Sequence, residues 1–425
     1  MDYKLNELLV ITEEDEKRIQ DGIEKNRKGN FSIKIPSCAG KKISVKLKNH
    51  KFRFGANIFM LDEVPDNESK NAIYREKFKE VFNLATLPFY WDATEPEDGK
   101  TRYHKGAEPL YRRPAIDLCI EYCEQNGIEP REHALCYTHF YPKWIREKSI
   151  EEFKVFMERR MQEIASRYAD KIPTIEVTNE VVWGYETFEF YKHNDYIEYC
   201  FNLADKYFPN NKLGINEWPG VWEGNGYNRD FYYAYIKDTI SRGCRVDAIG
   251  FQYHMFFREN EYYNKTRKFY NISHLFKIMD KYSEFDKELE LTEITIPAYS
   301  NDPDNEELQA DIIEKLYSVW FSHPKMEKII YWNVVDGYAA YTTPGNMTDG
   351  ENYYYGGLLR HDMTEKPSFK RLKKLIKEVW TTNEDVVVNN EGYANFRGFY
   401  GKYEISVDGK TYEVDFNENG KEISL

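Results

Sequence analysis

The sequence predicts an α/β fold: a (β/α)8 barrel with a small accessory β-module built from the N- and C-terminal segments. Three observations predict it. Eight short apolar runs alternate with helical patterns across residues 51–380, which is typical of a closed parallel barrel. Both ends of the chain lack this rhythm and contain strands of alternating polarity instead. The length of 425 residues fits one such barrel with additions.

The N-terminal segment, residues 1–50, begins with a charged amphipathic pattern that predicts a helix over 12–28. Two alternating strands follow at 31–35 and 41–47, joined through Pro36–Gly40, and we expect them to form a hairpin-like unit. Two strands bury too little apolar surface to be stable alone, so a partner sheet is needed.

The central segment, residues 51–380, contains the barrel. Its predicted strands cover 52–59, 82–91, 129–137, 173–179, 212–216, 247–253, 288–293 and 328–334. Most of the intervals carry a helical pattern, at 72–82, 114–127, 150–170, 195–208 and 306–321, and a final helix is predicted over 368–380. Apolar strands alternating with helices predict parallel pairing with the helices outside.

The C-terminal segment, residues 381–425, contains no helical pattern. Asp408-Gly409 and Asn419-Gly420 are dipeptides typical of two-residue hairpin turns, so we expect hairpins there. The segment is too short to form a core alone. It is therefore expected to pack with the N-terminal strands, as a structural cap rather than a carbohydrate-binding module.

The composition excludes several classes of function. A net charge of −13 argues against a nucleic-acid partner, which requires a basic surface. No run approaches the roughly 20 apolar residues of a membrane span. The first 22 residues lack the basic and apolar regions of a signal peptide, which indicates the cytoplasm, or secretion if a leader has been removed. The six cysteines show no metal-binding spacing, so we expect free thiols and neither metal nor cofactor.

Two runs that end near a glutamate carry the strongest functional signal. IEVTNE ends in Asn179-Glu180, and LELTEI contains Glu293. Buried parallel strands of this kind deliver side chains to the carboxyl edge of the sheet. Two carboxyl groups brought together there can cut a glycosidic bond. An aromatic content of 16% agrees, since tyrosine and tryptophan rings have flat faces that match sugars.

Ordered motifs in the barrel segment resemble glycoside hydrolase family 10, the retaining β-1,4-xylanases. The resemblance covers residues 52–378. Its motifs are Phe54-Gly55-Ala56, the segment from Trp91 to Glu97, His133, Val177-Thr178-Asn179-Glu180, Ile215-Asn216-Glu217-Trp218, Gly250-Phe251-Gln252-Tyr253-His254 and Thr292-Glu293-Ile294.

This resemblance implies a role for each matched residue. Glu180 corresponds to the acid/base and Glu293 to the nucleophile of a double displacement. Asn179 would hydrogen-bond the sugar 2-hydroxyl or Glu293, and His254 would orient Glu293 and keep it anionic. Further substrate-binding residues are expected along the cleft, with Trp332 as a platform beneath the reacting sugar. They are His133, Gln252, Asn216, Trp332 and Trp91, together with Tyr137, which departs from the family pattern.

The chain departs from the family pattern at the glycone side, where sugars on the non-reducing side of the bond bind. The charged stretch that grips these sugars is replaced by Thr86–Trp91. After the third strand, Cys136-Tyr137-Thr138-His139-Phe140 replaces the family's Trp, second His and Gln. Thr295 replaces the acidic partner of His254. We therefore expect aromatic side chains to supply the sugar contacts.

These departures leave the substrate more open than the reaction. Xylan or xylo-oligosaccharides are the favoured substrates. Another or decorated β-glycan, cleaved by a β-xylosidase or β-glucanase, is the first alternative. A carbohydrate-binding pseudoenzyme is the second, although Glu180, Glu293 and His254 argue against it. Endo versus exo action and the oligomeric state are left open.

Overall fold

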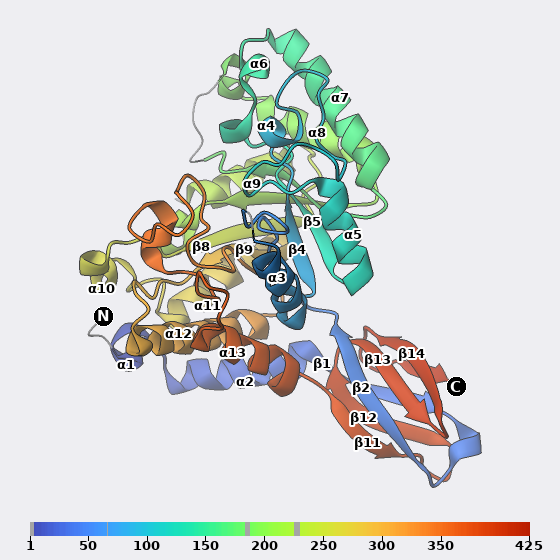
Figure 1. Ribbon diagram of the computed structural model, residues 1–425. Helices are drawn as coiled ribbons and strands as arrows, with labels where there is room; N and C mark the ends of the chain where they lie inside the picture. Colours follow the sequence, from blue (N-terminus) through green and yellow to red (C-terminus); the bar gives the residue numbers. More distant parts are fainter. Residues whose placement is uncertain (1–3, 66, 183–187, 225–229) are drawn as a thin grey trace.

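A computed structural model describes residues 4–65, 67–182, 188–224 and 230–425. Its centre is a closed barrel of eight parallel strands in the order β10-β3-β4-β5-β6-β7-β8-β9, which confirms the predicted fold class (Figure 1). The strands are β3 (Arg53–Asn57), β4 (Leu84–Pro88), β5 (Glu129–His133), β6 (Thr174–Asn179), β7 (Lys212–Glu217), β8 (Ala248–His254), β9 (Glu288–Thr295) and β10 (Met326–Tyr331).

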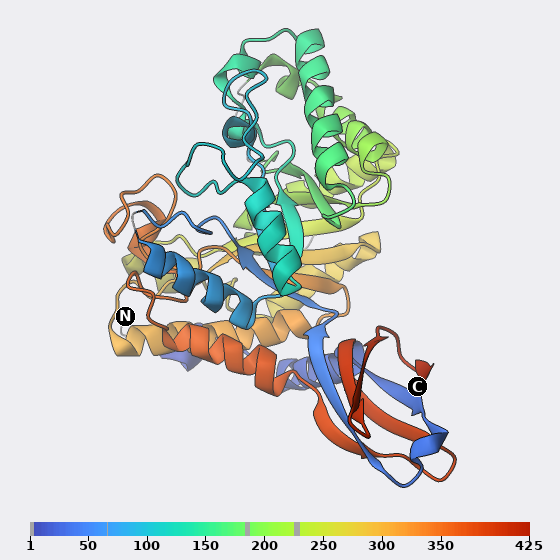
Figure 2. The ribbon, with the colours of Figure 1, turned by 45° about the vertical axis from the view of Figure 1, so that its right-hand side comes forward.

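Helices surround the barrel, and local sequence signals fix where they begin and end (Figure 2). Ser149 caps the helix that begins at Ile150 through reciprocal hydrogen bonds with Glu152. Gly127, in a left-handed conformation, ends the helix that begins at Ile116. The main helices are α3 (Glu68–Val81), α5 (Ile116–Asn126), α7 (Ile150–Tyr168), α8 (Tyr196–Tyr207), α9 (Phe231–Ser241), α11 (Ile272–Tyr282), α12 (Pro303–Ser322) and α13 (Pro367–Lys374). Short helices are α1 (Leu5–Leu8), α4 (Trp91–Thr94), α6 (Lys143–Arg146) and α10 (Tyr262–Lys265). Among the described residues, no helix is long and apolar enough to cross a membrane.

The predicted N-terminal helix is α2 (Glu13–Arg27), and it packs along α12. Its close approach requires Gly22, because a Cβ there would lie 2.6 Å from the carbonyl oxygen of Ser322. At its end the buried Arg27 guanidinium donates to backbone carbonyl groups, including that of Met326 at 2.6 Å. The end of α2 is therefore fixed beside the start of the last barrel strand, β10.

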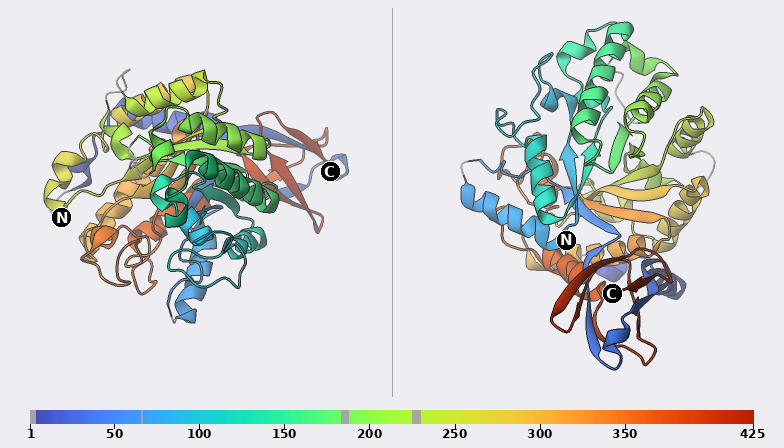
Figure 3. Two further views of the ribbon diagram at one scale, coloured as in Figure 1. Left: turned by 90° about the horizontal axis from the view of Figure 1, so that it is seen from above. Right: turned by 90° about the vertical axis from the view of Figure 1, so that its right-hand side faces the viewer.

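The two chain ends form one β-module of two sheets, β12-β1-β15 and β11-β2-β13-β14. Its strands are β1 (Lys28–Lys34), β2 (Lys42–His50), β11 (Asn383–Val387), β12 (Tyr393–Phe399), β13 (Gly401–Val407), β14 (Lys410–Phe416) and β15 (Glu422–Ser424). Because β2 runs almost directly into β3, the module hangs from the amino-terminal end of the barrel, away from the carboxyl edge (Figure 3).

Two turn predictions in this module are wrong and one is confirmed. β1 and β2 do not pair with each other: they lie in different sheets, because the tail supplies β12 beside β1, and β11 and β13 on the two sides of β2. Asp408 and Gly409 form the expected hairpin turn between β13 and β14, both with positive φ. Asn419-Gly420 does not form one, since β15 continues beside β1 in parallel.

The barrel interior contains a buried ionic network as well as apolar side chains. Arg131 pairs with Glu176 at 2.6 Å and with Glu290 at 3.0 Å, and Lys328 pairs with the other oxygen of Glu290. Although burial raises it, Lys328 and Arg131 bring the pKa of Glu290 down to about 2. The network joins four strands, β5, β6, β9 and β10, below the carboxyl edge.

Candidate active site

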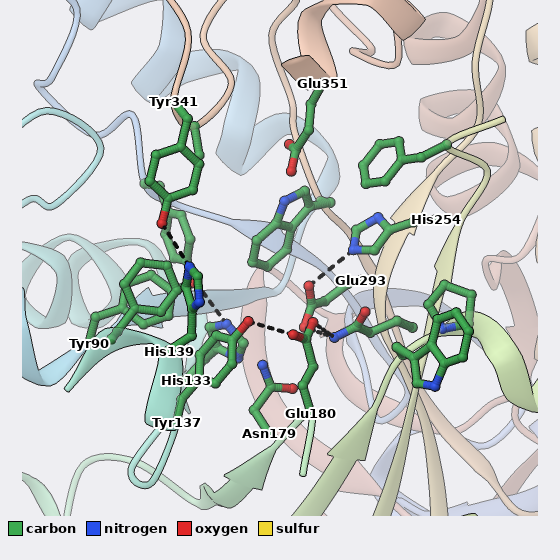
Figure 4. A pocket seen from close by; sticks show the side chains of 18 of the residues that line it. Tyr90, His133, Tyr137, His139, Asn179, Glu180, His254, Glu293, Tyr341 and Glu351 are labelled. Carbon is green, nitrogen blue, oxygen red and sulfur yellow. Dashed lines mark hydrogen bonds and ion pairs between the residues drawn. The ribbon is translucent and has the colours of Figure 1, made fainter. Parts of the chain in front are cut away.

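The strand ends predicted to carry the chemistry meet in one cavity of about 380 Å³ at the carboxyl edge of the barrel. Figure 4 shows Tyr137, Glu180, Glu293 and His254 directed toward one another there. Eight of the ten predicted site residues line this cavity, Glu180 and Glu293 among them, and their neighbours include arginine and further aromatic side chains. The lining predicted residues are His133, Tyr137, Asn179, Glu180, Gln252, His254, Glu293 and Trp332.

Backbone irregularities aim both glutamates into the cavity. Glu180 follows β6 with a φ of 53°, a left-handed conformation that a non-glycine residue adopts only when its surroundings hold it. Its N–H donates to the carbonyl oxygen of Asn216 at 3.1 Å. In β9, Thr292 is an extra residue relative to β8, so Glu293 lies opposite Gln252.

Gln252 joins the two carboxyl groups. Its Nε2 donates to Oε1 of Glu180 at 2.8 Å and to Oε1 of Glu293 at 3.2 Å. Two oxygens bound to one nitrogen at these distances lie at most about 6 Å apart, which is below the about 6.5–9.5 Å between the two carboxyl groups of inverting glycosidases.

Burial dominates the electrostatics of Glu293. It raises the pKa of this carboxyl group to about 8, Glu176 and Glu180 add to the increase, and His133 and Arg131 oppose it. The site therefore retains one proton near neutral pH.

His254 supplies a neutral hydrogen bond to Glu293. Burial lowers the pKa of His254 to about 4, so the ring is uncharged near neutral pH. Its Nε2 lies 3.1 Å from Oε2 of Glu293, and its Nδ1 lies 3.0 Å from the hydroxyl oxygen of Thr295. When Glu293 is ionised its oxygens can only accept, so Nε2 then carries the hydrogen and Nδ1 accepts from the hydroxyl of Thr295. Thr295 thus replaces the missing acidic partner.

Tyr137 contacts Glu180 directly. Its hydroxyl donates to Oε2 of Glu180 at 2.6 Å. Burial, and then the Glu180 carboxylate, raise the pKa of Tyr137 well above its ordinary value, so the phenol keeps its proton. Tyr137 therefore contributes a hydrogen bond as well as the aromatic surface expected from the sequence.

His133 connects the cavity to the buried network. Its Nε2 lies 2.9 Å from the hydroxyl of Tyr90, and its Nδ1 lies 2.8 Å from Oε1 of Glu176. Burial lowers its pKa, but the Glu176 carboxylate outweighs this and raises the pKa above the ordinary value. A positive charge on this ring favours the anionic form of the nearby Glu293.

Two predicted substrate-binding residues do not line the cavity, and the prediction is wrong for both. Asn216 is 0% exposed, and its amide donates to Oδ1 of Asn179 at 2.9 Å and to Oε1 of Glu293 at 3.1 Å. It therefore supports the site from below, and Asn216 rather than Asn179 holds Glu293. Trp91 is 1% exposed. It begins α4, donates to Glu95 at 2.9 Å and packs among Tyr141 and Trp144.

Several residues on the cavity wall were not predicted from the sequence. Arg112 and Arg113 end the loop that precedes α5, while Tyr341 and Glu351 come from the long segment after β10. A position between a barrel strand and its following helix was the available signal, because such loops lie at the carboxyl edge. This position does not reveal which loop residues turn inward.

The floor of the cavity is formed by Trp332. The rings of Phe59, His133 and His254 lie edge-on around its indole ring.

No group of three or more His, Cys, Asp or Glu side chains that could hold a metal ion occurs in the part of the chain described above.

Comparisons with known proteins agree with this geometry. Residues 45–374 match the model of glycosyl hydrolase family 10. An endo-1,4-beta-xylanase B of Thermotoga neapolitana is 24% identical over 79% of this chain and 91% of its own length. The anti-sigma-I factor RsgI6 of Acetivibrio thermocellus is 26% identical over 90% of this chain but only 45% of its own length. This chain likewise spans less than half of other curated relatives it matches.

Solved structures show the same fold. Native xylanase 10B from Thermotoga maritima has a TM-score of 0.62 at 21% identity, covering 77% of this chain and 96% of that one. Xylanase 10B from Thermotoga petrophila, solved with xylobiose, has a TM-score of 0.60 at 20% identity, covering 77% and 95%. Because the family match spans most of the chain and its motifs meet in one cavity, this protein belongs to glycosyl hydrolase family 10.

Proposed function

We propose that this protein is a retaining glycoside hydrolase that cleaves β-1,4-xylosidic bonds in xylan or xylo-oligosaccharides. The observation that carries the proposal is the close pairing of Glu180 and Glu293 through Gln252. Membership of family 10 and the xylanase names of several relatives support the substrate.

The proposed reaction is a double displacement. A carboxylate oxygen of Glu293 attacks the anomeric carbon while Glu180 gives its proton to the departing glycosidic oxygen, which leaves as the free hydroxyl of the aglycone. Glu180, now ionised, then removes a proton from water. That water attacks the anomeric carbon, releases Glu293 and yields a hydroxyl of retained configuration.

The hydrogen bonds around the pair suit this sequence. The amides of Asn216 and Gln252 and the neutral ring of His254 all donate to Glu293, so they hold its oxygens in a fixed position for attack. The single proton of the pair must lie on Glu180 when the first step begins. Because Tyr137 and Gln252 both contact Glu180, we assign them to positioning the acid.

By the family resemblance, the ends of β4 and β5 form the glycone side of the site, around Tyr90 and His133. Trp332 lies beneath the reacting sugar, and its indole ring supplies an apolar face. On the other side of the catalytic pair, Trp218 and Glu223 line the cavity, and we assign them to the departing part of the glycan.

The test is hydrolysis of linear and arabinose-decorated xylan, matched β-glucan and an aryl β-xyloside, with the anomeric configuration of the first product followed by proton NMR. The proposal expects β-configured product from a xylose-containing substrate. Inverted product would contradict the mechanism, and activity on β-glucan alone would contradict the substrate. Binding without turnover of even the aryl β-xyloside would favour a carbohydrate-binding pseudoenzyme.

A further inference from the structure

The glycone end of the cavity is filled by a stack of side chains. The ring of Tyr90 lies 4.1 Å from that of Phe140, at an interplanar angle of 28°, and the guanidinium of Arg113 lies 4.2 Å from the centre of the same Tyr90 ring. Arg113 also lies 5.4 Å and 5.6 Å from the ring centres of Phe140 and Phe59. Protein groups already contact Tyr90 and Phe140 closely, so these rings act as a wall rather than as open sugar platforms.

Three loops meet above this stack. The hydroxyl of Tyr341, from the segment after β10, lies 3.4 Å from Nε2 of His139, which follows β5 (Figure 4). Arg112, from the segment between β4 and α5, donates to the carbonyl oxygen of Tyr338. Next to it, the hydroxyl of Tyr111 lies 3.5 Å from the carbonyl oxygen of Ala339. The loops after β4, β5 and β10 are thus joined across one end of the cavity.

A closed end limits where a glycan can be cut. Cleavage inside a long chain needs an open groove on both sides of the catalytic pair, so that the polymer can extend past it in both directions. Here the stack formed by Tyr90, Phe140 and Arg113, and the contact between His139 and Tyr341, stand on one side. We propose, building on the function proposed above, that the site receives the non-reducing end of the glycan and releases short products from that end.

Tyr341 offers a way to test this without disturbing the core. It is 77% exposed, so its side chain contributes little to packing, yet its hydroxyl completes the contact with His139. Tyr341→Ala is expected to open the rim, and Tyr341→Phe to remove only the hydroxyl contact. Phe231→Ala is the matched control, because Phe231 is an aromatic residue of similar exposure, 80%, on α9 outside this cavity.

The measurement is a time course on reducing-end-labelled β-1,4-xylo-oligosaccharides and, in parallel, matched cello-oligosaccharides. The wild type and Phe231→Ala are expected to shorten the labelled chain by the same short unit at each step. Tyr341→Ala is expected to release longer unlabelled fragments early, with Tyr341→Phe between the two. Wild-type cleavage at internal bonds from the first time point, or from the labelled end, would overturn the inference while leaving the proposed function intact. No hydrolysis of either series would overturn both.

Discussion

At the scale of single residues, the raised pKa of Glu293 determines how the site responds to pH. Burial raises the pKa of Glu293 from 4.5 to about 8, so between these values the folded protein holds a proton that the unfolded chain releases. The contribution of this proton to the free energy of unfolding is fully present below pH 4.5 and is lost as the pH rises through about 8.

Glu293→Gln removes this titration and should stabilise the protein only at higher pH. We expect the free energy of unfolding to increase by about 1–3 kcal/mol at pH 8 and to change little at pH 4. Urea unfolding at the two pH values measures it. An equal increase in the free energy of unfolding at pH 4 and pH 8 would show that the charge of Glu293 does not destabilise the folded protein.

Tyr137→Phe tests the hydrogen bond to Glu180 separately from the aromatic ring. Loss of one bond to a charged group should lower kcat/KM on oligosaccharides about 10- to 100-fold, or about 1.5–3 kcal/mol. The thermal midpoint should hardly move, because the ring remains. Phe140→Ala is the contrasting variant: since Phe140 stacks on Tyr90, it should disturb the wall. A fall in stability of Tyr137→Phe with unchanged kinetics would contradict a role at the acid.

The sequence predicted the chemistry of the site better than its geometry. Residues at barrel strand ends reach the cavity by topology, so Glu180 and Glu293 could be placed in advance, and the family resemblance added Gln252 and His254. Whether a neighbouring residue points into the cavity or below it depends on bulges and left-handed residues that the sequence does not reveal. That is why Asn216 was expected at the substrate and Trp91 on the wall.

At the scale of elements, the buried network ties β5, β6, β9 and β10 together. Arg131 is the shared partner of Glu176 and Glu290, and removing one partner of a buried ion pair leaves an uncompensated charge. Arg131→Met is therefore expected to lower the free energy of unfolding by about 3–5 kcal/mol.

Lys206→Met is the matched control for Arg131→Met, because it breaks the exposed pair of Lys206 with Glu158 and should leave unfolding almost unchanged. Urea unfolding compares the two. Equal losses of unfolding free energy in the two variants would mean that the buried network stabilises the barrel no more than an exposed ion pair does.

The strand positions were predicted from apolar runs to within a few residues. The buried network was not predicted, because charged residues in such runs do not identify their partners.

At the scale of the whole molecule, the two ends of the chain complete one module. Removal of residues 381–425 would leave β2 without β11 and β13, and β1 without β12 and β15. The buried faces around Phe31 and Val45 would then be exposed. We expect this truncation to lower the thermal midpoint markedly and to increase aggregation.

Removal of residues 417–425 is the control, since it takes away only the short edge strand β15 and should have a small effect. Thermal unfolding and light scattering distinguish the two. An unchanged thermal midpoint for the longer truncation would show that the barrel does not depend on the β-module.

The sequence predicted that the two chain ends associate but not which strands pair, because alternating strands specify a buried face and not a neighbouring strand.

The central claim, that Glu180 is the acid/base and Glu293 the nucleophile, is tested most directly by azide rescue of the two alanine variants with product stereochemistry. Glu180→Ala should fail on natural glycans yet form the glycosyl-enzyme from an activated aryl glycoside, whose leaving group needs no proton. Azide should then restore turnover with a β-glycosyl azide. Glu293→Ala should be inactive on both substrates, and azide should give the α-glycosyl azide. The reverse pattern of configurations would contradict the account.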